Sequence, residues 1–296
     1  MLSFLLMLLA SIFFTGIVVR VKSRIQGRRG PVLLQPFFDV IRLLRKGSVY
    51  STTTGPIFRM APTVYFASVI MAMAVVPFAG HGGLISFAGD FVFFAYVLAF
   101  GKFFNIIASL DTGSSFEGMG ASREALFSML VEPAFFLLIG SLALLTGHTS
   151  FAQIFASFHL GSYTSYALAA IAAFVLLMIC LIENSRMPID DPKTHLELTM
   201  VHEVMILDNS GFDLGLIMQS THLKFAMYSA LIANLFMGDL SLPWAIALFF
   251  AIQILCAVIV GFIETFMARY RMSHNAQFIL ALTSLSLLVF FCVKFN

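Results

Sequence analysis

Charge is scarce in this sequence. Only 11% of the 296 residues are Asp, Glu, Lys or Arg, whereas 60% are hydrophobic. Average globular chains hold about 25% charged residues, so this chain has too little polar surface to face water on all sides. The composition excludes an ordinary soluble domain and indicates that most of the surface faces lipid.

Cysteine and net charge are low as well. Cys180, Cys256 and Cys292 each stand alone in an apolar run, with no CxxC spacing and no Cys/His pair for zinc or an iron–sulfur cluster. We therefore expect inert thiols, and neither a metal nor a redox centre in this chain. The formal net charge of +2 is too small to indicate nucleic-acid binding.

Long runs without charge predict membrane-spanning helices, because a bilayer core of about 30 Å needs about 20 apolar residues per helix. Residues 1–19 lack the basic start and cleavage pattern of a secretory signal, so we expect a retained first span. The eight predicted spans cover residues 1–19, 61–79, 91–110, 125–147, 166–183, 222–238, 241–263 and 275–294. The charge-free part of the sixth, residues 225–238, is short and also fits a re-entrant segment.

The placement of Lys and Arg decides the number of crossings. With eight spans, 15 of the 17 basic residues fall in four loops on one side, residues 20–60, 109–124, 183–224 and 264–275. With seven spans, Arg269 and Arg271 would move to the other side, against the positive-inside rule. We therefore predict one all-α membrane domain over residues 1–296, with eight transmembrane helices, these loops in the cytoplasm and both termini outside.

The first basic loop predicts a short amphipathic helix at the membrane interface. After Pro36, apolar residues recur at helical spacing with polar ones opposite. A basic anchor for anionic lipid headgroups is one interpretation. The stiff Arg28-Arg29-Gly30-Pro31 turn favours a docking surface for another protein, because an electrostatic anchor needs charge but no particular backbone shape.

The third loop carries two histidines. His195, Thr199 and His202 lie roughly on one face of a predicted helix, with Glu203 adjacent. A metal site is one interpretation, but two histidines seven residues apart lack a signature such as HExxH. We therefore favour solvated or hydrogen-bonded histidines.

Two charges within predicted spans cannot easily reach a membrane interface, Lys102 in the middle of one span and Glu132 directly before Pro133. A charged side chain at the bilayer centre costs roughly 2.5–3.5 kcal/mol, so such groups face a bundle interior and mark ion or proton paths. Glu183 and Glu264 end spans and could snorkel to the surface. Together with Asp190, Glu197 and Glu203, they form a predicted cluster of carboxylates at one end of the bundle. Such crowded, partly buried carboxylates exchange protons readily near neutral pH.

Several motifs carry a family resemblance. In chain order they are Arg28-Arg29-Gly30-Pro31 with Gln35 and Asp39, Phe58-Arg59-Met-Ala-Pro62, Leu110-Asp111-Thr-Gly-Ser, Gly120-Ala-Ser-Arg123-Glu124, Glu183…Arg186-Met-Pro-Ile-Asp190, and Glu264…Arg269-Tyr-Arg271. Over about residues 20–275 the chain resembles the H-type (subunit 1) membrane family of respiratory complex I. It resembles more closely the membrane subunits of group 4 nickel–iron hydrogenases, of the hydrogenase-4 and formate hydrogenlyase type.

The resemblance implies a subunit that docks large and small hydrophilic redox subunits. It also implies a link to antiporter-like membrane subunits in a bacterial or archaeal cytoplasmic membrane. Iron–sulfur clusters, and nickel–iron where it is retained, would lie in partner subunits, and this chain would bind no cofactor. The expected proton path comprises Lys102, Glu132, Glu183, Asp190, Glu197, Glu203 and Glu264. The expected docking residues are Arg24, Arg28, Arg29, Asp39, Arg42, Arg59, Asp111, Arg123, Glu124, Arg186, Arg269 and Arg271.

Two other functions stay open from the sequence. The complex I pattern E-T-N-R-x-P-F-D-x-P-E appears here as Glu183-Asn-Ser-Arg-Met-Pro-Ile-Asp-Asp-Pro-Lys193, which favours the hydrogenase type over a quinone-reducing complex with an apolar chamber beside the first span. A stand-alone secondary transporter is the third candidate. Against it, spans one to four show no repeat in spans five to eight, and long basic loops suit docking.

Overall fold

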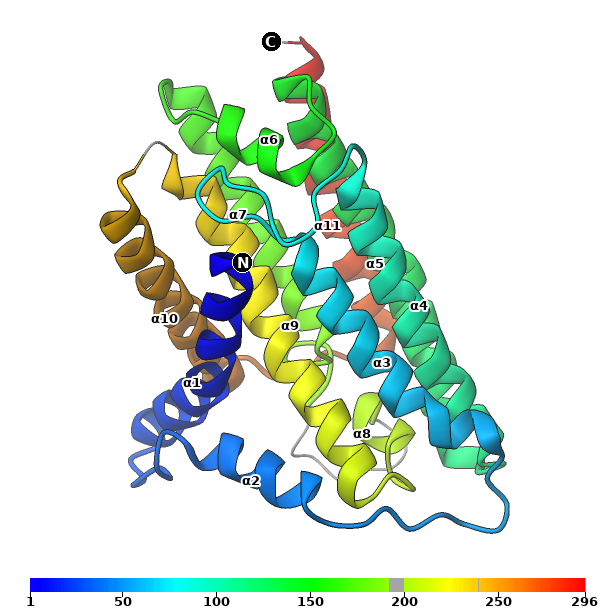
Figure 1. Cartoon of the computed structure of the whole chain (residues 1–296). Coiled ribbons are helices and arrows are strands. Elements are labelled where there is room, and N and C mark those ends of the chain that lie inside the picture. The colour runs from blue at the N-terminus through cyan, green and yellow to red at the C-terminus, as the bar shows by residue number, and fades with distance from the viewer. Residues whose placement is uncertain (192–199, 239, 296) are drawn as a thin grey trace.

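The structure is a computed structural model that describes residues 1–191, 200–238 and 240–295. In this part of the chain the regular structure is a set of helices joined by short connections (Figure 1). The helices are α1 (Leu2–Ile25), α2 (Gln35–Leu44), α3 (Pro56–Val75), α4 (Asp90–Asp111), α5 (Ser115–Thr146), α6 (Phe151–Ser157), α7 (Tyr163–Glu183), α8 (His202–Met205), α9 (Gly211–Met237), α10 (Leu242–Phe266) and α11 (Met272–Phe295).

In the described part of the chain, seven helices are long and apolar enough to cross a membrane, namely α1, α3, α4, α5, α7, α10 and α11. A helix satisfies its own backbone hydrogen bonds, which lipid cannot do, so long apolar runs in a bilayer fold this way. The predicted all-α membrane fold is confirmed.

Helix α9 differs from the other long helices in composition. It has 27 residues, or about 40 Å, but it carries Asp213, His222 and Lys224, all buried. In Figure 1 it runs from the end of the bundle that holds α2 and α8 to the end that holds α6. It therefore corresponds to the sixth predicted span, although its composition alone does not mark it as one.

α5 and α9 begin well before the corresponding predicted spans, which start at residues 125 and 222. α5 starts at Ser115 and α9 at Gly211, so much of the expected loops 109–124 and 183–224 is helical. The polar residues at these helix starts resemble a loop when spans are located by hydropathy. The pair Ser210 and Asp213, with Ser210 at the N-cap position, matches the S-x-x-D pattern of helix starts.

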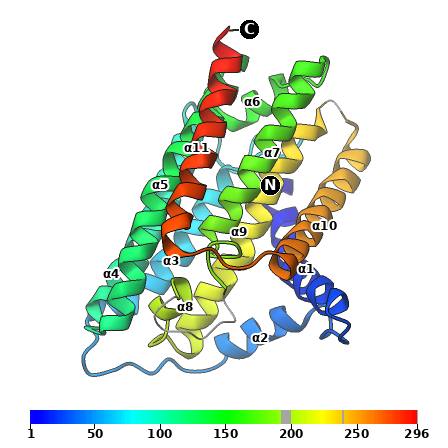
Figure 2. The same ribbon diagram turned by 180° about the vertical axis from the view of Figure 1, so that it is seen from behind.

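The predicted amphipathic helix is present as α2, with Pro36 in its first turn. Val40 is buried, and the end of α2 packs on the start of α9, where a side chain in place of Gly215 would contact Leu44. The opposite side of α2 exposes Phe38. α2 is therefore attached to the bundle and lies across one end of it (Figures 1 and 2).

The core is built around α9, which contacts α1, α2, α3, α7 and α10. Phe225 of α9 stacks on Phe14 of α1 with ring centroids 5.0 Å apart, and Tyr228 meets Phe94 of α4 edge to face at 6.1 Å. Because protein surrounds α9, polar side chains on it can be satisfied by neighbouring helices rather than exposed to lipid.

Both ends of the chain lie at the same end of the bundle. The Ser3 hydroxyl donates to the carbonyl of Val76, just after α3 (2.7 Å). Thr164, at the start of α7, and Phe295, at the end of α11, line one surface cavity. This arrangement fits an even number of crossings, with the basic connections at the opposite end.

The close approach of α3 and α4 generates a stability prediction. A Cβ atom at Gly101 would overlap the Ser68 side chain of α3, whereas a Cβ at Gly140 of α5 would meet nothing. Gly101→Val should lower the free energy of unfolding by about 1–3 kcal/mol, the usual range for overpacking. Thermal denaturation of the detergent-solubilised protein, with Gly140→Val as control, measures this. Equal melting temperatures for the two variants would contradict the packing described.

Candidate functional site

Four buried charges from four helices meet inside the bundle. Lys102 of α4 pairs with Glu124 of α5 (2.9 Å) and with Glu183 at the end of α7 (3.1 Å). Lys224 of α9 pairs with the other carboxylate oxygen of Glu183 (3.2 Å). We call these four residues the central cluster.

The central cluster balances two cations against two anions. All four side chains are at most 11% exposed, and that of Lys224 is fully buried. Taking an ion out of water costs several kcal/mol, so buried charges persist only when they are paired. Removing one partner of a buried pair typically destabilises a protein by about 3–5 kcal/mol. The four residues therefore act as one electrostatic unit.

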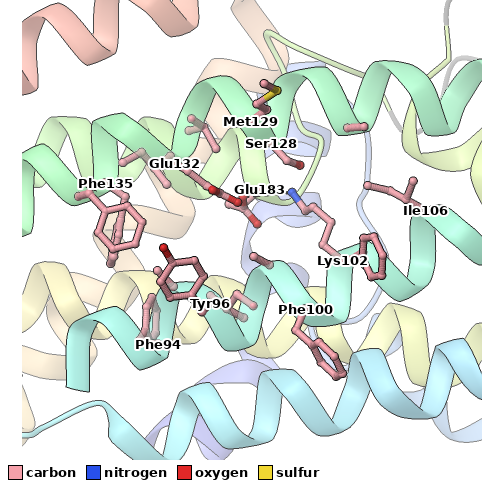
Figure 3. Close-up of a pocket in the computed structure, with 18 of the residues that line it drawn as sticks. Phe94, Tyr96, Phe100, Lys102, Ile106, Ser128, Met129, Glu132, Phe135 and Glu183 are labelled. Carbon is pink, nitrogen blue, oxygen red and sulfur yellow. Dashed lines mark ion pairs between the residues drawn. The ribbon is translucent and has the colours of Figure 1, made fainter. Parts of the chain in front are cut away.

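Beside the central cluster lies a cavity of about 600 Å³ between α4 and α5. Aromatic side chains such as Phe94, Phe100 and Phe135 form most of its wall, and Glu132 borders it together with Lys102 and Glu183. In Figure 3 the side chains of Lys102, Glu132 and Glu183 point toward the same part of the cavity. The carboxylate of Glu132 therefore lies next to the central cluster, in addition to those of Glu124 and Glu183.

Glu132 differs from the other carboxylates of the site. Among the residues that the structure describes, no hydrogen bond or ion pair to its carboxylate is found. α5 continues through Pro133, which has no N–H to donate to the carbonyl of Met129. Met129 also borders the cavity, as does Ser128, whose buried hydroxyl has no partner. This stretch of α5 presents polar groups that are free to bind water or a proton.

A second group of charges joins α1 and α10 to the segment after α7. Glu264 of α10 pairs with Lys22 of α1 (3.5 Å) and with Arg186 (3.1 Å). The Arg186 guanidinium also lies 5.3 Å from the ring centroid of Phe225. Because Phe225 directly follows Lys224 in α9, this group adjoins the central cluster.

A third group centres on Asp190. Its carboxylate pairs with Arg269 (2.9 Å) and accepts hydrogen bonds from the backbone N–H groups of Val201 (3.0 Å) and His202 (3.1 Å). Burial raises the pKa of Asp190, although Arg269 and these N–H groups oppose the rise. Asp190 therefore ties the connection between α10 and α11 to the start of α8.

Residues 183–190 connect the three groups. Within eight residues, Glu183 binds both lysines, the Ser185 hydroxyl donates to Glu124 (3.1 Å), Arg186 binds Glu264, and Asp190 binds Arg269. A turn follows α7 in which Ser185 has a positive φ of 46°, a conformation that non-glycine residues seldom adopt. The predicted acidic motif is thus the junction of the polar network.

The structure describes only part of the segment that carries the two predicted histidines. His195, Glu197 and Thr199 lie outside the described residues. His202 is the first residue of α8, and burial, with nearby Lys224, Lys102 and Arg186, lowers its pKa to about 4. His202 is therefore neutral at physiological pH. Glu203 follows it on α8, half-buried. Across residues 1–191, 200–238 and 240–295, no three His, Cys, Asp or Glu side chains gather as a metal site.

The expected docking residues divide by burial. Those exposed at the end that bears α2 and the α10–α11 connection are Arg24, Arg28, Arg29, Arg42, Arg59 and Arg271. Asp39 and Arg42 pair within α2 (3.4 Å), and the Arg59 guanidinium lies 4.9 Å from the ring centroid of Tyr50. The exposed arginines form a basic surface, which we call the arginine surface.

The other expected docking residues make internal contacts. Asp111 accepts from the N–H of Gly55 (2.7 Å) and so caps the start of α3, and Arg123 donates to the carbonyl of Met200 (3.0 Å). Arg186 and Arg269 are the ion-pair partners described above. Glu124 was expected on the docking surface, but the structure places it inside the bundle, because α5 begins nine residues before it.

Sequence reasoning missed two members of the network. Lys22 fell within a predicted loop, and Lys224 fell where the predicted loop 183–224 and the predicted span 222–238 overlap, yet the two lysines lie in α1 and α9. The helix-start pattern at Ser210 and Asp213 could have extended α9 and placed Lys224 among its apolar residues. No comparable signal marks Lys22, because a lysine near a helix end normally reaches the interface.

Comparison with known proteins identifies the family. A family model described as NADH dehydrogenase matches residues 1–294. Hydrogenase-4 component C of Escherichia coli (strain K12) is 34% identical over 239 residues, which are 78% of this chain and 72% of that protein. Formate hydrogenlyase subunit 4 of the same strain is 28% identical over 271 residues, 87% of this chain and 86% of that protein.

A solved structure shares the fold. A chain of the membrane-bound sulfane sulfur reductase, described as an archaeal respiratory membrane complex, superposes with a TM-score of 0.81 over 99% of this chain and 97% of its own. Its sequence identity is 19%, so this likeness concerns the fold alone. Together with the sequence matches, it confirms the predicted resemblance. The chain belongs to the NADH dehydrogenase family, as a membrane subunit of the H type (subunit 1).

Proposed function

We propose that this chain anchors a hydrophilic redox arm to the membrane and provides the first part of a proton path in an energy-converting complex. The observation that carries the proposal is the row of three charged groups joined through residues 183–190, which leads from Asp190 and Arg269 to the cavity at Glu132. Relatives are a hydrogenase-4 component and a formate hydrogenlyase subunit, so a multi-subunit membrane complex is the setting.

The arginine surface supports the docking role. Its exposed guanidinium groups lie on the side of the chain that holds most Lys and Arg residues, which the positive-inside rule assigns to the cytoplasm. Arginine is suited to protein interfaces because its planar group binds carboxylates in pairs of hydrogen bonds. We infer hydrophilic partners that hold the iron–sulfur clusters and any nickel–iron centre, a cytoplasmic membrane location, and termini on the outer side.

The polar network supports the coupling role. Electron transfer in the docked arm would change the electric field at the cytoplasmic connections and thereby the protonation of Glu183, Glu197, Glu203 and Glu264. Residues 183–190 contact all three charged groups, so a disturbance at this segment reaches the central cluster directly. The released protons, or Na⁺ in a sodium-coupled complex, would leave past Glu132.

The cavity supports a neighbour on the α4–α5 face. Tyr96 and Met129 at this face are 61% and 73% exposed, and the Glu132 carboxylate borders the same opening. A carboxylate that faced acyl chains would be strongly disfavoured. We therefore place an antiporter-like membrane subunit against α4 and α5, where it would receive the proton.

A second candidate is quinone chemistry, which one observation favours. An apolar pocket of about 390 Å³ lies between α1 and α10, bordered by Phe13, Phe14, Leu33, Phe250 and Gln253. This is the first-span side on which a quinone tail would bind. Inhibitor-sensitive quinone reduction by the purified complex would favour this candidate, whereas hydrogen evolution from formate or reduced ferredoxin would favour the hydrogenase type.

The coupling role predicts that Glu132→Gln and Glu183→Gln each lower the redox-driven membrane potential sharply. A lost proton-transfer group typically slows the step about 100-fold or more. A potential-sensitive dye in inverted vesicles during redox turnover measures the effect. Asp208→Asn, at an exposed carboxylate outside the network, is the control and should retain the potential. A normal potential in both glutamine variants would rule the path out.

The docking role predicts that charge reversal on the arginine surface releases the hydrophilic partners. The double variant Arg28→Glu and Arg29→Glu should retain less of the arm than the unaltered chain at low salt, and more salt should narrow the difference, because exposed charges are screened. Co-purification on a tagged chain at low and high salt measures retention. Lys294→Glu, an exposed charge at the opposite end, is the control. Equal loss from both variants would contradict a specific docking surface.

A further inference from the structure

The two lysines that share Glu183 have different surroundings. The Lys224 ammonium is enclosed: it pairs with the Glu183 carboxylate (3.2 Å), lies 3.4 Å from the Glu183 main-chain carbonyl oxygen, and is 5.0 Å from the ring centroid of Tyr65. Its side chain is fully buried. Lys102, in contrast, borders the cavity beside Glu132.

The carboxylates also differ in what they retain when one lysine is lost. Without Lys224, Glu124 keeps both Lys102 (2.9 Å) and the Ser185 hydroxyl (3.1 Å). Of the cations that the structure describes, Glu183 then keeps Lys102 alone and shares it with Glu124. Without Lys102, Glu183 keeps Lys224 to itself. The two lysines are therefore not interchangeable for Glu183.

We propose that Lys224 is a positioning residue of this site, whose enclosed ammonium keeps Glu183 ionised in the resting complex, before redox turnover. Glu183 can then remain a carboxylate while Lys102, which borders the cavity, responds to the charge on Glu132. The central cluster is neutral only with both lysines present, because two carboxylates and one ammonium would leave an uncompensated buried negative charge. In that case a proton taken up by Glu183 restores neutrality.

The inference deepens the proposed function and rests on it only in treating Glu183 as part of a proton path. Its test reads the protonation of Glu183 chemically and involves no transport. Failure of the pumping prediction would therefore leave this result intact, and failure here would leave the pumping result intact.

The experiment maps carbodiimide adducts on the purified complex. Dicyclohexylcarbodiimide enters apolar sites and reacts with protonated carboxyl groups. The carboxyl proton moves to one carbodiimide nitrogen and the carboxylate oxygen bonds to the central carbon, which gives an O-acylisourea. The acyl group then migrates from this oxygen to the other nitrogen, the C–O bond to the acyl carbon breaks, and a stable N-acylurea remains. Glu183 borders the apolar cavity, so the reagent reaches it there. Peptide mass spectrometry then locates the adducts.

We expect no adduct on Glu183 in the unaltered complex and a new adduct on Glu183 in Lys224→Met. Lys224→Arg, which keeps the positive charge, should return Glu183 to the unmodified state. Lys102→Met should leave Glu183 unmodified, because Lys224 remains. An adduct on Glu183 in the unaltered complex, or its absence from an assembled Lys224→Met complex, would overturn the proposal.

If Lys224→Met does not assemble, the matched double variant Lys224→Met with Glu183→Gln decides the question. It removes one charge of each sign and leaves Lys102 with Glu124. Recovered assembly, measured by size-exclusion chromatography, would support charge compensation as the role of Lys224. Equal failure of the single and double variants would show that the lysine acts through packing, and the proposal would fall.

Discussion

The structure depends on the compensation of buried charge at Glu183. This carboxylate ends α7 inside the bundle and is held by two lysines from two other helices. An ionised carboxylate without a partner in that position would be strongly unfavourable, so the meeting of α4, α7 and α9 at this point stabilises the charged form of the site. The same requirement brings in α5, since the second contact of Lys102 is Glu124. The packing of these four helices and the assembly of the site therefore depend on the same ion pairs.

The segment after α7 extends this constraint to the rest of the molecule. A cis peptide joins Met187 to Pro188, and the turn lets adjacent residues point in different directions, toward α5, α10 and the α10–α11 connection. A regular helix could not do so, because its side chains repeat on one face every three to four residues. Residues 183–190 therefore both join the charged groups of the structure and form the centre of the proposed coupling role.

Much of the fold followed from hydropathy and charge placement. The membrane class, the amphipathic α2 and the position of Lys102 inside the bundle were all predicted, because long apolar runs and isolated charges within them have few physical solutions. Lys224 and Glu124 were assigned to loops or surface, because a hydropathy pattern gives a helix its length but not the neighbours around it. Which charges pair is a tertiary property, and the spacing of residues along one chain does not encode it.

Helix α9 has a consequence for biogenesis. The machinery that inserts helices into the bilayer responds to hydrophobicity, and charged residues near a helix centre oppose insertion. α9 carries Lys224 near its middle and does not reach the hydropathy of a membrane span, whereas the adjacent α10 has the highest mean hydropathy of the seven, 2.8. α9 should therefore enter the membrane together with α10 as a hairpin, and only after α4 and α7 are in place to receive its lysine.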